Sequence, residues 1–200
     1  NLVLIPVVTF YLLRDWDRLM ARSAALLPRA AAPTVTRLAR DCNTVLGAFL
    51  RGQLLVMLCL AILYSLGLSV IGLDSAVAIG VIAGLLSFVP YLGIFTGIIL
   101  ALLSAIIQGQ GWPLLVEVLI VFGVGQLLSD FVLTPRLVGE RIGLHPLLVI
   151  FAILAGGELF GFAGVLLALP VAATGTVLVR YAHERYIKSR LYQDTGEGAP

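Results

Sequence analysis

Four apolar segments most constrain what this chain can fold into. They are residues 46–72, 76–107, 114–133 and 146–179. About 20 apolar residues in a helix cross a bilayer, and a helix satisfies its backbone hydrogen bonds within one segment, as lipid requires. Of the 200 residues, 60% are hydrophobic and 12% are charged, against about 25% charged in a soluble domain. The sequence therefore predicts an all-α, polytopic membrane helical bundle.

The charged residues gather outside these segments and predict the domain organisation. Residues 14–45 carry Arg14, Arg18, Arg22, Arg29, Arg37 and Arg40, and arginine favours the cytoplasmic side. Apolar positions at helical spacing after Pro33 predict a helix that follows the membrane surface and then enters the membrane. We expect residues 1–13 to end a truncated transmembrane helix, 14–45 to form a cytoplasmic amphipathic segment, 46–190 to form the transmembrane bundle, and 191–200 to be a disordered tail.

Two of the apolar segments, 76–107 and 146–179, are too long for one comfortable crossing. Pro90 and Gly93 interrupt the first, and the glycines of residues 156–161 interrupt the second. Proline removes an amide donor, and glycine permits a tight turn. We therefore expect two broken helical hairpins, each returning to the side from which it entered.

The positive residues predict which side each connection faces. Turns 72–75 and 108–113 carry no Lys or Arg, whereas 134–143 and 180–190 carry several. The hairpin arrangement puts the first pair outside and the second pair inside, which satisfies the positive-inside rule at every loop. A single crossing by each long segment would instead put the arginines of 134–143 outside. We expect residues 180–200 to be cytoplasmic.

A weak internal repeat relates the two hairpins. The pattern Gly-x-x-Leu-Ala-Leu-x-x-Ala starts at both Gly97 and Gly164, and Ala83-Gly84 upstream matches Ala155-Gly156. Two similar broken hairpins of opposite entry are typical of inverted-repeat secondary transporters. The alternative is that helices rich in glycine, alanine and leucine resemble one another by chance.

Glu158 is a candidate site residue because it follows Gly156-Gly157 in an apolar segment. A carboxylate at mid-membrane costs about 2.5–3.5 kcal/mol on insertion scales, so it needs water, a partner or a substrate. A broken helix frees backbone groups that bind ions or polar solutes, and a carboxylate there could hold a cation or carry a proton. The alternative is a shallow hairpin whose Glu158 reaches an aqueous vestibule.

Asp130 is a second candidate, on a helical stripe with Gly123 and Gln126. This small, polar face could line a solute path. The alternative is an interfacial acid paired with Arg136 or Arg141.

Pro90 and Tyr91 mark the break of the first hairpin, where the freed backbone and the Tyr91 hydroxyl could contact a polar solute. The alternative is a proline-kinked helix packed in the bundle.

No motif indicates catalysis or phosphate binding: the sequence has no Walker-type loop, HExxH or GxSxG. Cys42 and Cys59 suggest no disulfide or metal site, and a net charge of +2 is too small to indicate nucleic acid. We expect no enzyme activity, no cofactor and no metal, with possible coupling to H⁺ or Na⁺.

Three runs resemble the autoinducer-2 exporter (AI-2E) family of bacterial permeases. They are FYLLRDWDRL (10–19), VPYLG (89–93) and DFVLTPRLVGERIGLHPLLVIFAILAGGELFGFAGVLLALP (130–170). The resemblance covers essentially the whole chain. It implies a multi-pass protein of the bacterial plasma (inner) membrane, a homo-oligomer, and export of small signalling molecules or sodium/proton antiport.

Two functions fit these patterns. A secondary, ion-coupled transporter of a small polar molecule, or a Na⁺/H⁺ exchanger, explains the broken helices and the membrane-embedded acids. A non-transporting membrane scaffold or interaction protein explains the breaks as packing features, and it predicts that Asp130 and Glu158 can be neutralised without loss of function.

Overall fold

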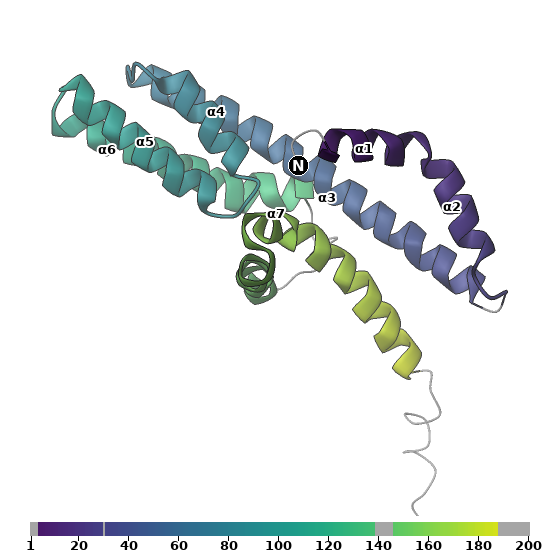
Figure 1. The fold of residues 1–200 in the computed structure, drawn as a ribbon. Helices are drawn as coiled ribbons and strands as arrows, with labels where there is room; N and C mark the ends of the chain where they lie inside the picture. Colours follow the sequence, from purple (N-terminus) through teal and green to yellow (C-terminus); the bar gives the residue numbers. More distant parts are fainter. Residues whose placement is uncertain (1–3, 30, 139–145, 188–200) are drawn as a thin grey trace, which may run out of the picture. The chain divides into compact units, whose positions relative to one another are not determined.

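The computed structural model describes residues 4–29, 31–138 and 146–187, and every regular element among them is a helix (Figure 1). The chain divides into two compact units, Asn1–Asn43 and Thr44–Pro200, and one helix crosses this boundary. The predicted all-α class is confirmed. Predictions for residues 139–145 and for the tail 191–200 fall outside the described residues.

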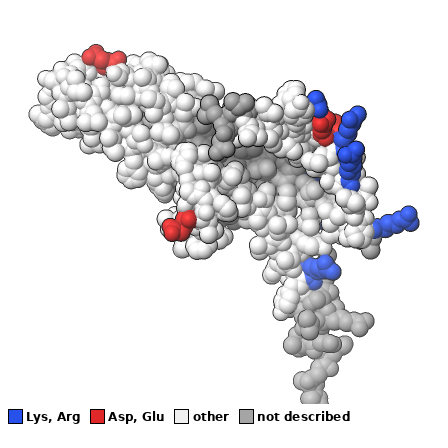
Figure 2. All heavy atoms as spheres, viewed as in Figure 1, with Lys and Arg blue, Asp and Glu red and all other residues white. Residues whose placement is uncertain are grey.

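The N-terminal unit contains α1 (Leu4–Arg14), α2 (Trp16–Ala25) and the start of α3 (Ala32–Val70). The sequence reading did not separate α2 as a helix. The guanidinium of Arg14 lies 4.6 Å from the ring centroid of Tyr11 and 3.3 Å from the carboxylate of Asp15. Basic side chains gather on the visible face of this unit (Figure 2).

The second unit is built on a core between α3, α4 (Ala76–Leu86), α5 (Leu92–Gln108) and α6 (Trp112–Leu128). Its largest fully buried side chains are Tyr64, Leu68, Val118 and Phe122, and the ring centroids of Tyr64 and Phe122 are 4.6 Å apart. Small residues let neighbouring helices of this core approach closely. A Cβ added at Gly84 of α4, for example, would lie 2.5 Å from the Cα of Ala61 on α3.

The first long segment is broken where the sequence predicts. α4 ends at Leu86, α5 begins at Leu92, and Tyr91 between them has φ 67°. Gly93 permits the close return, because an added Cβ would collide with the backbone of Ala83 and Ser87. We call residues 87–91 the hairpin tip.

At the end of this hairpin opposite the tip, hydrogen bonds connect turns 72–75 and 108–113, which are distant in sequence. The Gln108 Nε2 donates to the Gly72 carbonyl at 2.8 Å, and the Asp74 amide lies 3.4 Å from the Gln108 Oε1. Turns 72–75 and 108–113 therefore lie at the same end of the helices, as the hairpin arrangement requires. We call this end the hairpin base.

The helix after α6 extends further than predicted. Residues Ser129–Val138 continue it as a π-helix, η1, so the turn predicted to start at Thr134 is wrong over residues 134–138. Pro135 lies inside this π-helix, and proline lacks the amide donor that the interior of an α-helix requires. Thr134 and Pro135, which predicted a turn, lie in the part of the helix that is π rather than α.

The last helix, α7 (Pro146–Ile187), is broken at Gly161, which has φ 61° and ψ −145°. Without a bend, Gly156 and Gly164 would lie about 12 Å apart along the axis. Instead, a Cβ added at Gly156 would be 2.6 Å from the Gly164 carbonyl oxygen. The second predicted hairpin is therefore present, and its break lies at Gly161, within the predicted range 156–161. Gly156 and Gly157, at the start of that range, are helical.

Three helical stretches of the described chain are long and apolar enough to cross a membrane: Ala32–Val70, Trp112–Leu137 and Leu147–Ile187. Their outer faces are apolar, as the exposed series Leu54, Leu58, Ile62 and Leu66 on α3 illustrates. The visible surface of the second unit is accordingly almost uncharged (Figure 2). These properties are those of a membrane protein.

Candidate functional site

The residues predicted to matter for function fall into three groups. Pro90 and Tyr91 are in the hairpin tip, Gln126 and Asp130 are where α6 meets η1, and the third group (Gly156, Gly157 and Glu158) is in the first arm of α7.

The hairpin tip packs against α3, and two of its backbone carbonyls accept hydrogen bonds from that helix. Pro90 is half-buried, whereas 61% of Tyr91 is exposed. The side-chain amide of Gln53 donates to the carbonyls of Ser87 and Phe88 at 2.9 and 3.4 Å. The sequence predicted backbone groups at this break that are free to contact a solute. Two of these groups, the carbonyls of Ser87 and Phe88, are instead bonded to the side chain of Gln53 on α3. Gln53 was not predicted as a site residue. A side-chain amide within the apolar segment 46–72 could have indicated it, because such a group needs a hydrogen-bond partner.

Gln126 and Asp130 form a closed pair, one helical turn apart. The Gln126 Nε2 donates to both carboxylate oxygens of Asp130, at 2.9 and 3.0 Å. Among the described residues Asp130 makes no ion pair with Arg136. Arg141 lies outside them, so the alternative of an acid paired with one of these two arginines stays a prediction. A Cβ added at Gly123 would meet nothing within 4 Å, so the stripe faces open space. This polar face is free to meet water, a solute or another protein surface.

Two buried residues with hydroxyl groups, on α3 and at the start of η1, were not predicted from the sequence. Ser129 is 7% exposed and Tyr64 is 1% exposed. A Cβ added at Gly125 would collide with the Tyr64 ring, so this ring lies directly on the backbone of α6. Tyr64, in the middle of segment 46–72, could have indicated a polar contact between helices, because the hydroxyl of a buried tyrosine usually has a hydrogen-bond partner.

Glu158 lies three residues before the Gly161 break and is exposed. Gly156 and Gly157 have a packing role instead: an added Cβ would be 2.6 Å from the Gly164 carbonyl oxygen and 3.1 Å from the Val165 Cγ2, respectively. The glycine pair thus brings the two arms of α7 together, and the carboxylate sits beside their crossing.

In both hairpins the two arms meet through small residues near the positions that the internal repeat equates. In the first, a Cβ added at Gly97 would lie 2.7 Å from the Cβ of Ala83. In the second, a Cβ added at Gly164 would collide with the carbonyl oxygen of Gly156. Gly97 corresponds to Gly164, but their partners differ by one position, because Ala83 corresponds to Ala155 and Gly84 to Gly156. Both hairpins close through small residues on their two arms.

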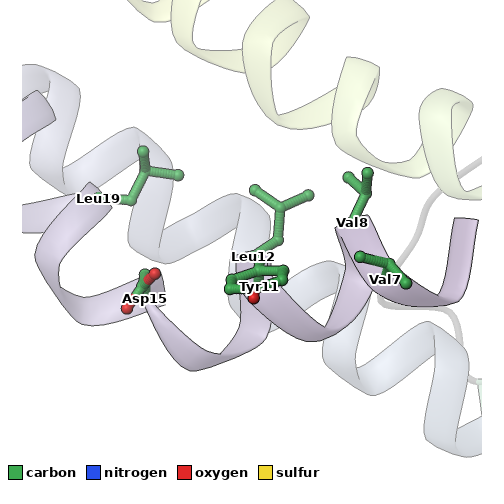
Figure 3. A pocket seen from close by; sticks show the side chains of 6 residues that line it. All are labelled: Val7, Val8, Tyr11, Leu12, Asp15 and Leu19. Carbon is green, nitrogen blue, oxygen red and sulfur yellow. The ribbon is translucent and has the colours of Figure 1, made fainter. Parts of the chain in front are cut away.

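The described chain offers no ready-made metal site: no three of its His, Cys, Asp and Glu residues gather in one place. A groove of about 650 Å³ runs between α3 and α4, lined by apolar side chains and by Ser65, whose hydroxyl lies 3.4 Å from the Val77 carbonyl. A smaller groove of about 300 Å³ on α1 and α2 is lined by Val7, Val8, Tyr11, Leu12, Asp15 and Leu19 (Figure 3). Both suit apolar groups rather than polar solutes.

Comparison with known proteins matches these features to a class of membrane transporter. The AI-2E family transporter profile matches residues 1–184, so the chain belongs to the AI-2E transporter family. This confirms the resemblance found in the sequence, and it supports a membrane transport role over an enzymatic one.

Individual relatives agree. The chain is 34% identical over 175 residues to "Putative transport protein YrrI" of Bacillus subtilis, covering 88% of this chain and 49% of that protein. It is 31% identical over 175 residues to "Putative permease PerM" of Escherichia coli K12, covering 86% and 48%. The chain thus spans about half the length of these curated relatives. No solved structure matches.

Proposed function

We propose that this chain is part of a secondary, ion-coupled transporter of the bacterial inner membrane. It moves a small polar molecule, or exchanges Na⁺ for H⁺, and works as a homo-oligomer. Family membership supports transport in general. The observation that carries the more specific proposal is the pair of apolar hairpins, each broken next to a residue with positive φ, at Tyr91 and at Gly161.

Broken helices suit solute transport for a physical reason. In lipid, non-helical backbone is tolerated only where protein or a water-filled cavity surrounds it. Secondary transporters place such breaks around the substrate near the membrane midplane, using repeated hairpins. In both hairpins the arms meet through small residues, Ala83 with Gly97 and Gly156 with Gly164, which supports a repeat of this kind.

Two carboxylates are proposed to handle the coupling ion. Asp130 retains acceptor capacity beyond its bonds to Gln126, because a carboxylate has about four lone-pair sites. Glu158 is exposed beside the crossing of the α7 arms. Either group can bind Na⁺ when ionised and carry H⁺ when protonated.

The test uses the full-length protein in proteoliposomes containing a pH-sensitive dye. An imposed Na⁺ gradient should drive H⁺ movement, and Glu158→Gln and Asp130→Asn should each slow it by about tenfold or more or remove its pH dependence. Glu117→Gln is the matched control, because Glu117 is an exposed acid of α6 outside the proposed path. Small polar solutes are then assayed for efflux in the same vesicles.

A scaffold is the second candidate, favoured by the tight glycine packing that accompanies both breaks. It predicts no flux of ions or solutes above empty vesicles. It also predicts that Glu158→Gln and Asp130→Asn leave cellular function intact, which would exclude the transport proposal.

A further inference from the structure

The hairpin tip presents two carbonyl groups that its own backbone leaves unpaired. A helix ends with four carbonyls lacking intrahelical partners. Around the end of α4, amides of the turn bond to the carbonyls of Ala83, Leu85 and Leu86, but none bonds to the carbonyls of Ser87 or Phe88. These two groups receive the side-chain amide of Gln53, which is 34 and 35 residues away in sequence.

The hydrogen bonds stabilise both partners, the side-chain amide of Gln53 and the two tip carbonyls. An unpaired carbonyl in an apolar environment costs several kcal/mol, and so does an unpaired amide. Gln53 is half-buried in an apolar stretch of α3, where the tip carbonyls are the partners of its amide. One side chain therefore removes the penalty from three groups at once.

The rest of the hairpin is held differently. Along its length, α4 meets α3 through small residues, with Gly80 against Ser65 and Gly84 against Ala61. At the hairpin base, Gln108 bonds to Gly72 and Asp74. Each end thus depends on one glutamine, and the tip depends on Gln53.

We infer that Gln53 is a positioning residue: its amide holds the hairpin tip, with Pro90 and Tyr91, against α3. The inference rests on the proposed function only in that Pro90 and Tyr91 are proposed to line the solute path. Methionine is the informative replacement, because it is unbranched and apolar and resembles glutamine in length, so it removes the donor with little change in packing.

The experiment is hydrogen–deuterium exchange on the full-length protein in lipid nanodiscs, with Gln53→Met and Gln108→Met as a matched pair. Gln53→Met removes both bonds and should speed exchange of the amides of residues 88–93 by roughly tenfold or more, since losing even one ordinary hydrogen bond shifts a local opening equilibrium by about that factor. It should leave residues 72–76 unchanged. Gln108→Met should do the reverse.

Unchanged exchange at residues 88–93 in the Gln53→Met protein would overturn the inference. So would an equal rise along all of α4 and α5, which would indicate general loosening. Because exchange is measured without any solute, this result does not depend on whether the protein transports. In Na⁺-driven flux, Gln53→Met should raise the half-saturating Na⁺ concentration and Gln108→Met should not; a normal value with disturbed tip exchange would reject only the role of the tip in transport.

Discussion

At the scale of the residue, glycines with the same sequence context have opposite roles. Gly84 and Gly123 both lie in apolar helices. A Cβ at Gly84 would lie 2.5 Å from both the Cα and the Cβ of Ala61, whereas a Cβ at Gly123 would meet nothing within 4 Å. Only the first glycine is required by packing.

The first prediction follows from this contrast. Gly84→Ala should destabilise the protein by about 1–3 kcal/mol, because the α3 backbone must move to admit the methyl group. Gly123→Ala should be neutral, or stabilise by up to about 1 kcal/mol through the higher helix propensity of alanine. Thermal unfolding in detergent measures both, and equal melting temperatures for the two variants would contradict the packing of α4 on α3.

At the scale of the element, α7 depends on one backbone conformation. Gly161 has φ 61° and ψ −145°, a region that side chains disfavour, yet an added Cβ would meet no neighbour. The constraint at this position is therefore conformational rather than steric. The arms that it joins cross at Gly156 and Gly164.

The second prediction is that Gly161→Ala opens the α7 hairpin, because holding alanine in this conformation costs about 1–3 kcal/mol. Spin labels at Leu154 and Val171, which are exposed on opposite arms, report the change. Their separation should lengthen toward about 26 Å, the rise of 17 residues in a continuous helix.

Gly175→Ala serves as the control on the same helix, since Gly175 is helical and an added Cβ there meets nothing within 4 Å. It should leave the label separation unchanged. A Gly161→Ala protein with the parental distance distribution would mean that the bend does not depend on glycine.

At the scale of the whole molecule, the arrangement of the turns predicts the membrane topology. The bonds from Gln108 to Gly72 and Asp74 bring turns 72–75 and 108–113 to one end. Neither turn carries a positive residue, so we predict that both face away from the cytoplasm.

The third prediction tests this with single cysteines at Asp74 and Gln110, in a background with Cys42→Ser and Cys59→Ala. A membrane-impermeant thiol reagent added to intact cells should label both positions. Labelling of one position alone would contradict the hairpin, whereas protection of both until the cells are opened would contradict only the orientation inferred from charge.

Much of the fold was predictable because the signals are local. Apolar length identifies membrane helices, and Pro90 and Gly93 interrupt a helix wherever it lies. The sequence was misleading at Thr134, where a turn was expected and the helix continues, and it did not single out Gly161 within the predicted break 156–161. Pro135 is accommodated by a wider helix, and the glycine pair serves packing; both outcomes depend on surroundings that local composition does not contain.

The candidate site was predictable as a set of residue types but not as a set of contacts. The stripe of Gln126 and Asp130 follows from helical periodicity, so the sequence alone placed both residues on one face. Gln53 could not be joined to Ser87 and Phe88 in the same way, because 34 and 35 residues separate them.

The sequence by itself determined that this chain is an all-α membrane protein of the AI-2E transporter family with two interrupted hairpins. Hydropathy, proline, glycine and the family motifs are all carried by the linear order of residues. Only the tertiary structure decided which backbone groups at the first break are already paired and which glycines are indispensable. Hydrogen bonds and steric contacts between helices depend on distances in space, and these exist only once the helices have packed.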